Sequence, residues 1–146
     1  MDINIKLNTE FAKIPTRGSA EAAGWDLYAG TNYEIEIMPH TTVKVDTGIS
    51  IEIPSGYFGA IYARSGLATK HGLRPANCVG IIDSDYRGNI LVALHNDTNY
   101  IQKIAINERI AQLVVQPYLP VNFNVVVGDL SETDRGSSGF GDSGRF

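Results

Sequence analysis

The chain has 146 residues, of which 43% are hydrophobic, and this is enough for one domain with a buried core. Its 12 Lys and Arg stand against 16 Asp and Glu, which gives a formal charge of -4 without any basic run. A protein that coats nucleic acid or an anionic membrane needs a broad basic surface, so neither partner is expected, whereas one small phosphorylated ligand remains compatible.

Strands are predicted over most of the chain. Ile and Val together number 26 against 9 Leu, and β-branched side chains suit a pleated surface. Apolar residues alternate, as in a strand with one buried face, at Ile3-Ile5-Leu7, Tyr33-Ile35-Ile37, Ile49-Ile51-Ile53 and Phe123-Val125-Val127. Turn-forming residues such as Gly18, Gly30, Pro54 and Gly88 separate the runs. Many short strands with frequent turns predict an all-β antiparallel sandwich or jelly roll.

One short helix is predicted over residues 65–71, SGLATKH. Ser65 is a candidate N-cap and Gly72 a candidate end, because serine oxygens cap helix N-termini and glycine adopts the left-handed conformation that follows a helix. We expect one or two helical turns.

The composition changes at Gly128. The last 19 residues hold 5 Gly and 4 Ser with few apolar side chains, so they cannot offset their ordering entropy alone. We therefore expect a β domain over residues 1–127 and a flexible glycine-rich arm over residues 128–146. The arm is either a tail or a segment that becomes ordered on binding.

The segment 80–88, GIIDSDYRG, is the first candidate for chemistry. Asp83 and Asp85 share one face of a strand unless a turn begins at Ser84. A carboxylate in a partly enclosed site can take a proton from water, and Tyr86 can lie against a ring or a sugar. The local sequence alone favours an ordinary turn, because Asp, Ser and Gly are turn formers.

Two further segments are candidate anion sites. Arg64 and Ser65 stand at the start of the short helix, where backbone N–H groups and a guanidinium can bind an anion, although a capped helix with a surface arginine explains them equally well. In the arm, closely spaced glycines let N–H groups surround a phosphate beside Arg135, and Phe140 can stack on a base. A disordered tail is the alternative.

Other polar and apolar residues have mainly structural interpretations. Trp25 and Cys78 are expected to pack in the interior. Asp26 is a turn cap or faces a metal-bound water. Arg109 and Gln112 are the polar groups of a predicted strand in the segment 108–115 that are able to recognise a ligand.

The sequence lacks the patterns of a membrane span, a signal peptide and a zinc site. No run approaches the roughly 18 to 20 apolar residues of a membrane span, and the first ten residues carry charges where a signal peptide is apolar. We expect an intracellular protein, in the cytoplasm, the nucleus or elsewhere in the cell, and not a secreted one. Cys78 is the single cysteine and His40, His71 and His95 are far apart, so disulfide and zinc chemistry are not expected.

Taken in order, five segments resemble the five motifs of the trimeric dUTPase family. They are AGWDLYAG (23–30), ARSGLA (63–68), ANCVGIIDSDYRGNI (76–90), ERIAQLVV (108–115) and RGSSGFGDSG (135–144). Each motif is weak alone, but turn chemistry gives no reason for all five in this order. The resemblance implies a distorted jelly-roll β-barrel with one short helix and a flexible C-terminal arm. It also implies a homotrimer with shared active sites that hydrolyses dUTP to dUMP and pyrophosphate with Mg²⁺, limiting uracil in DNA and supplying dUMP for dTMP synthesis.

The resemblance also implies roles for individual residues. The hairpin from Asn77 to Gly80 reads uracil through backbone groups, Tyr86 lies against the deoxyribose, and Asp83 binds the 3′-OH and deprotonates the attacking water. The residues implied in phosphate binding are Arg64, Ser65, Gly66 and Gln112. Asp26 binds Mg²⁺ through its water shell. The arm closes over the nucleotide, with Gly139 among its glycines, Arg135 and Ser143 on the γ-phosphate and Phe140 stacked on uracil.

The sequence is also compatible with two alternative functions. Asp142 stands where the fifth motif usually has Ser, which motivates a nucleotide-gated binding protein on the same fold. A dCTP deaminase-like enzyme shares the fold and some motifs, but the uracil hairpin and the intact IDSDYRG segment argue against it.

Overall fold

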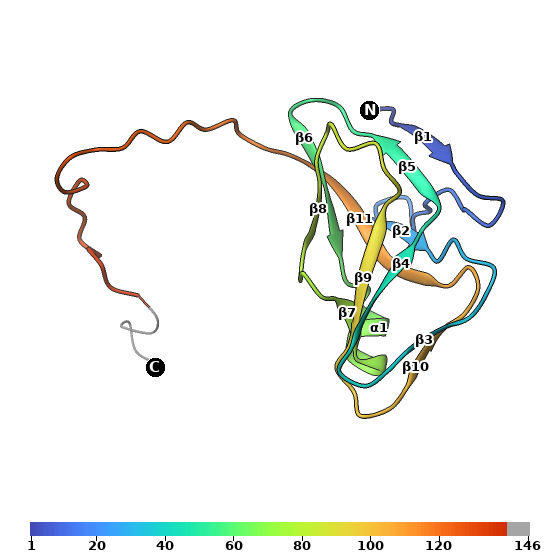
Figure 1. The fold of residues 1–146 in the computed structure, drawn as a ribbon. Helices are drawn as coiled ribbons and strands as arrows, with labels where there is room; N and C mark the ends of the chain where they lie inside the picture. Colours follow the sequence, from blue (N-terminus) through green and yellow to red (C-terminus); the bar gives the residue numbers. More distant parts are fainter. Residues whose placement is uncertain (140–146) are drawn as a thin grey trace.

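The computed structural model describes residues 1–139, which form eleven strands and one helix (Figure 1). The strands are β1 (Asn4–Leu7), β2 (Trp25–Tyr28), β3 (Ile35–Ile37), β4 (Thr42–Asp46), β5 (Ile49–Glu52), β6 (Tyr57–Tyr62), β7 (Leu73–Pro75), β8 (Gly80–Ile82), β9 (Leu91–Asn96), β10 (Gln102–Ile104) and β11 (Arg109–Pro117). The helix, α1 (Ser65–His71), lies between β6 and β7. This mostly β architecture with one short helix agrees with the predicted fold class.

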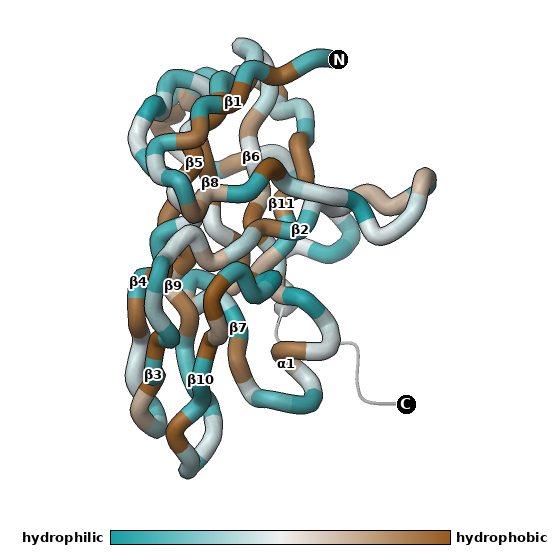
Figure 2. The backbone as a smooth tube through the Cα atoms, turned by 90° about the vertical axis from the view of Figure 1, so that its right-hand side faces the viewer, coloured by the Kyte–Doolittle hydropathy of each residue, from teal (hydrophilic) through white to brown (hydrophobic). Residues whose placement is uncertain are grey.

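The strands pair into four antiparallel sheets. The largest has the order β2-β11-β6-β8, a second has the order β4-β9-β7, and β1-β5 and β10-β3 form two-stranded sheets. Hydrophobic stretches in Figure 2 lie on the strands and hydrophilic ones on the connecting loops. The alternation of side chains along a strand builds the core. In β9, Val92, Leu94 and Asn96 are buried, and the residues between them are more exposed. Val92 and Leu94 belong to the same core cluster as Leu27 and Leu113 of the largest sheet.

Asn96 is a fully buried polar side chain, and its hydrogen bonds tie three segments together. Its Nδ2 donates to the carbonyls of Ile37 (2.9 Å) and Tyr100 (2.7 Å), and its Oδ1 accepts from the Thr98 N–H (2.9 Å). A buried amide satisfied in this way fixes the turn between β9 and β10 at little cost.

The helix prediction is confirmed in its range but wrong in its cap. Arg64, in extended conformation, is the N-cap residue, and Ser65 is the first helical residue. The helix ends as expected at Gly72, whose φ of 62° is left-handed and whose N–H donates to the Leu67 carbonyl. Leu67 is the buried side chain that attaches the helix to the core.

Three of the four alternating runs form strands, and the fourth does not. β11 is the last strand, and none of residues 118–139 belongs to a strand. Phe123, Val125 and Val127 are at least 93% exposed on a segment that runs away from the body (Figure 1). The prediction of a strand at 123–127 is therefore wrong, because alternation makes a strand only where a neighbour pairs with it and a core receives its apolar face.

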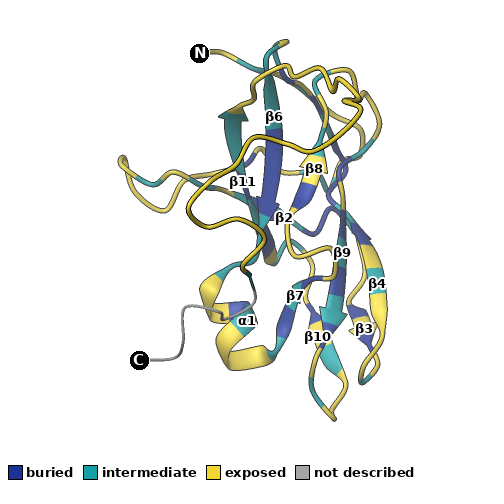
Figure 3. Ribbon diagram, turned by 90° about the vertical axis from the view of Figure 1, so that its left-hand side faces the viewer, coloured by how far each residue is buried: buried dark blue, intermediate teal, exposed yellow. Residues whose placement is uncertain are grey.

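Buried and exposed segments are separated along the chain (Figure 3). The central strands β6 and β9 are largely buried, whereas most of α1 and the segment after β11 are exposed. No helix among the described residues is long and apolar enough to cross a membrane.

Candidate functional site

One group of predicted site residues meets where β2, β11 and β6 lie side by side. Gln112 on β11 is in register with Asp26 on β2 and with Tyr62 on β6, and Arg64 follows β6 by two residues. Asp26 Oδ1 accepts a hydrogen bond from Arg64 Nε at 2.9 Å, and Asp26 Oδ2 accepts one from Arg109 Nη1 at 3.1 Å. The carboxylate thus links two guanidinium groups.

The charge of this group is positive despite the acidity of the chain. Asp26 is 14% exposed, while Arg64 and Arg109 are 26% and 49% exposed. Two guanidinium groups against one carboxylate leave one net positive charge, and each guanidinium has more N–H donors than the one it shares with Asp26. The group is therefore suited to an anion.

Arg109 was expected only as a polar group able to recognise a ligand, and its contact with Asp26 was not predicted. The contact depends on a break in the β11–β2 register between Arg109 and Ala111. Such a β-bulge re-aims a side chain, and period-two counting does not reveal it.

Gln112 is held in place from two sides. Its Nε2 donates to the Ala63 carbonyl at 2.8 Å. A Cβ on Gly24 would overlap Gln112 Oε1, so glycine lets the two strands approach closely here. Ser65 and Gly66 lie next to this group, at the exposed start of α1.

A second group of predicted site residues lies around β8, and one of them, Asp83, lines a cavity at the end of that strand. The cavity has a volume of about 540 Å³ and is lined by Tyr57, Phe58, Ile81, Asp83, Ser84, Asp85 and Tyr118. β8 ends at Ile82 and the turn begins at Ser84, so Asp83 stands between strand and turn. Tyr86 is 42% exposed, and its N–H donates to the Asp83 carbonyl at 3.1 Å. An exposed carboxylate beside a partly apolar cavity can orient a water near a bound ligand.

Asn77 and Gly80 belong to the turn that connects β7 to β8, two strands that pair with β9 and β6 and not with each other. The turn is tight: Cys78 has a φ of 62°, and its N–H donates to the Pro75 carbonyl at 3.1 Å. Gly80 is buried against Ile61, while Asn77 and Cys78 are exposed. The expectation that Cys78 packs as a small buried hydrophobe is wrong, because the turn conformation directs it outward.

Arg74 of β7, just before this turn, is hydrogen-bonded to Asp97, just after the end of β9. Its Nε and Nη2 donate to the two carboxylate oxygens of Asp97 at 2.7 Å and 3.0 Å. This bidentate hydrogen bond is the main reason that the pKa of the Asp97 carboxyl lies below its usual value. His95 Nε2 lies 3.5 Å from the same carboxylate.

Trp25 was also expected inside, and it is instead 41% exposed with the Arg17 guanidinium 5.0 Å from its ring centroid. It lies on the edge strand β2, so half of its ring has no neighbouring strand to cover it. The cation–π contact holds the loop before β2 beside the Asp26 group.

The two groups lie toward opposite ends of the same sheet. Ile82, next to Asp83, is in register with Gly59 of β6, whereas Arg64 follows the other end of β6. The six residue-to-residue steps from Phe58 to Arg64 span roughly 20 Å at about 3.3 Å per step. Within one chain, Asp83 and Tyr86 are therefore not brought to Asp26, Arg64 and Gln112.

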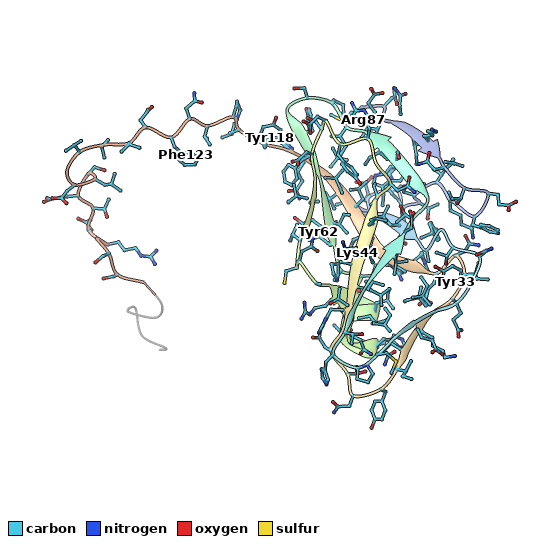
Figure 4. All side chains as sticks on the ribbon, viewed as in Figure 1. Tyr33, Lys44, Tyr62, Arg87, Tyr118 and Phe123 are labelled. Atoms are coloured by element: carbon cyan, nitrogen blue, oxygen red, sulfur yellow. The ribbon has the colours of Figure 1, made fainter. Side chains whose placement is uncertain are left out.

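The predicted arm residues are far from both groups. Arg135 is exposed, and its Nε donates to the Ser138 carbonyl at 2.9 Å within the arm. Gly139 is half-buried. Phe123, which is labelled in Figure 4, shows how far the segment after Tyr118 extends from the body. Phe140 and Ser143 lie outside the described residues.

Asp26 is the candidate metal ligand of the first group. Within residues 1–139, no three His, Cys, Asp or Glu side chains gather to hold an ion. Each Asp26 oxygen still has lone-pair capacity beyond its one guanidinium hydrogen bond. One carboxylate fits a Mg²⁺ ion that keeps most of its waters and is held mainly by substrate phosphates.

Comparison with known proteins identifies a single family. The dUTPase family model matches residues 10–144. The deoxyuridine 5'-triphosphate nucleotidohydrolase of Escherichia phage T5 is 44% identical, with 97% of this chain and 98% of the relative covered. The enzyme of the same name from Desulfitobacterium hafniense strain DSM 10664 / DCB-2 is 46% identical, with coverages of 90% and 87%.

The fold agrees with solved structures of this family. The dUTPase of Staphylococcus bacteriophage 80alpha with dUPNHPP aligns with a TM-score of 0.89 and 28% identity, with 98% of each chain covered. Its G164S mutant with dUpNHpp aligns with a TM-score of 0.88, again with 98% of each chain covered. On the family match and the identity to curated relatives, the chain belongs to the dUTPase family of nucleotide-hydrolysing enzymes.

Proposed function

We propose that the chain hydrolyses dUTP to dUMP and pyrophosphate by attack of an Asp83-activated water on the α-phosphorus. In a cell this reaction limits uracil in DNA and supplies dUMP for dTMP synthesis, so the enzyme acts inside the cell, in the cytoplasm or the nucleus. The observation that carries the proposal is the pair of half-sites: a carboxylate cavity at one end of a sheet and a guanidinium pair at the other.

The cavity is the proposed nucleoside half-site. Asp83 binds the 3′-OH, orients the water and takes its proton, and Tyr86 lies against the deoxyribose. The exposed turn at Asn77, closed by Gly80, reads uracil through backbone groups. An aromatic ring beside a carboxylate suits a sugar, which has both apolar and polar edges.

The guanidinium pair is the proposed phosphate half-site. Arg64, Ser65, Gly66 and Gln112 bind phosphate oxygens, and positioning together with charge neutralisation supplies most of the rate in such a reaction. Asp26, through water, is the residue that would hold Mg²⁺, which supplies positive charge to the triphosphate when bound. Asp26 also keeps Arg64 and Arg109 in one orientation before a nucleotide arrives.

The two half-sites support a homotrimer with shared active sites. Since Asp83 and Arg64 are roughly 20 Å apart along one chain, a triphosphate needs the cavity of one copy and the guanidinium pair of another. The exposed apolar run Leu119, Val121, Phe123, Val125 and Val127 also needs a cover, which a neighbouring subunit offers. On this proposal residues 1–127 form the subunit domain and residues 128–146 close over the nucleotide, with Arg135, Gly139, Phe140 and Ser143 as contacts.

The deciding experiment is pyrophosphate release from dUTP, dCTP, dTTP and UTP in the presence of Mg²⁺. We expect rapid turnover of dUTP and slow turnover of the other three nucleotides. Tight dUTP binding without turnover would instead support a nucleotide-gated binding protein. Ammonia release from dCTP would support a deaminase.

A further inference from the structure

The hydroxyl of Tyr86 is fixed by two neighbours that follow it in the chain. Tyr86 Oη donates a hydrogen bond to the Asn89 carbonyl at 2.9 Å. A Cβ on Gly88 would overlap the same Oη, so the ring lies directly against the backbone of the turn. The position of the ring therefore depends on the position of Asn89.

Asn89 is in turn held by side chains from distant parts of the sequence. Its Nδ2 donates to both carboxylate oxygens of Asp46, at 2.9 Å and 3.2 Å, and its Oδ1 accepts from Asn8 Nδ2 at 2.6 Å. Asp46 is itself oriented by the Gly48 N–H, which donates to Oδ1 at 2.7 Å. The amide of Asn89 is thus bound on both its donor and its acceptor side.

The residue after Asn89 belongs to the rigid core. Ile90 is fully buried, its N–H donates to the Ile49 carbonyl at 2.9 Å, and its carbonyl accepts from Thr47 Oγ1 at 2.8 Å. Residues 85–88, by contrast, are all exposed. Asn89 is therefore the point at which an exposed turn is attached to the body.

We infer that Asp46 and Asn89 are positioning residues that hold the Tyr86 ring against the sugar and so set the discrimination of dUTP from UTP. The inference rests on the proposed function, which places Tyr86 on the deoxyribose. A ring held firmly leaves no space for a 2′-hydroxyl, and a ring free to shift admits it. Small displacements of positioning groups have large effects on reacting geometry.

The test is the ratio of kcat/KM for dUTP to kcat/KM for UTP. We expect Asn89→Ala, which removes the amide but keeps the main-chain carbonyl, to lower this ratio on the order of tenfold, chiefly by improving UTP. Both substrates are measured on one preparation, so a loss of folded enzyme cancels from the ratio. Tyr86→Phe, which removes only the hydroxyl, should give a similar ratio even if Asn89→Ala folds poorly.

Further variants separate positioning from general destabilisation. Asp46→Asn keeps an acceptor oxygen for Gly48 and Asn89 and should retain more discrimination than Asp46→Ala. The double variant N89A/Y86F should be no less selective than either single variant, because both changes act on one contact. The matched control is Asn99→Ala, which removes an exposed amide bonded to His40 at 2.8 Å and should leave the ratio unchanged.

The outcomes distinguish this inference from the proposed function. A wild-type enzyme that discriminates strongly, with N89A and Y86F variants that discriminate equally well, overturns the inference alone. Additive losses in the double variant also overturn it. A wild-type enzyme that hydrolyses dUTP and UTP equally overturns the placement of Tyr86, and the inference with it.

Discussion

At the scale of single residues, the orientation of a charged side chain depends on its hydrogen-bond and ion-pair partners. Asp26 forms ion pairs with both Arg64 and Arg109. It thereby holds two positively charged side chains close together in a chain whose net charge is -4. Removing such a partly buried carboxylate would leave two guanidinium groups to repel each other. Single residues therefore set the local charge, which on the proposed function serves to bind a triphosphate.

Asp83→Asn is the sharpest test at this scale. We expect turnover of dUTP to fall by about 100 to 10,000-fold, because the amide cannot accept the proton of the attacking water. Nucleotide affinity should change little, since the amide keeps the size and an acceptor oxygen. The measurements are steady-state turnover and dUTP affinity by calorimetry.

Asp85→Asn is the matched control for that variant. It removes the same charge from the same cavity, two residues away. Its turnover should stay close to that of the wild type. Near-normal turnover in D83N, or an equal loss in D85N, would contradict the assignment of Asp83 as the base.

At the scale of elements, short strands are joined by turns that need external support. The turn between β7 and β8 contains a non-glycine residue with positive φ, Cys78, and the Arg74–Asp97 pair attaches its start to the end of β9. The strand β9 is among the best buried in the fold, so the pair connects an exposed turn to a rigid element. This support has a pH dependence.

The stability contributed by Asp97 should be lost in acid. Its pKa is lowered in the folded state by the hydrogen bond from Arg74, so the unfolded chain binds its proton first as the pH falls. The contribution is complete above the unfolded pKa of about 3.9 and disappears as the pH drops through the lower folded value. We expect the stability difference between the wild type and D97N to be constant above about pH 5 and to narrow as the pH falls further.

Urea unfolding at a series of pH values measures this difference. Asp129→Asn, in the exposed arm, is the control and should follow the wild type at every pH. A difference between the wild type and D97N that is constant with pH would show that the Arg74 hydrogen bond does not carry the effect.

At the scale of the whole molecule, the chain is divided into a packed body and an extended arm. The last strand ends at Pro117, and the buried core is built from residues between Leu27 and Leu113. Stability and activity should therefore depend on different segments. The body supplies the fold, whereas on the proposed function the arm completes the site in an assembly.

Removal of residues 130–146 should leave a folded trimer with little activity. The deletion touches no core residue, so the thermal midpoint and the number of subunits in the assembly should match those of the full chain. Turnover of dUTP should collapse, because a lid excludes water and completes the catalytic groups. Light scattering, thermal unfolding and pyrophosphate release test these points, and full activity in the truncated chain would refute the lid.

Much of the fold was predictable because local patterns and tertiary structure agree. The alternation at Ile35-Ile37 and Ile49-Ile51 became strands, and Gly72 ended the helix. The wrong predictions concern residues whose burial depends on whether another strand lies beside them. Trp25 is exposed because β2 is an edge strand, and the alternating run at 123–127 has no strand beside it.

The sequence by itself determined the all-β class, the short helix and, through five ordered motifs, the family. These depend on side-chain period and on residue identity, both of which are local properties. Only the tertiary structure decided that Arg109 shares Asp26 with Arg64, that Asn89 anchors Tyr86, and that Asp83 lies at the far end of the sheet. Strand register, a bulge and the pairing of distant segments set these relations, and no single stretch of sequence encodes them.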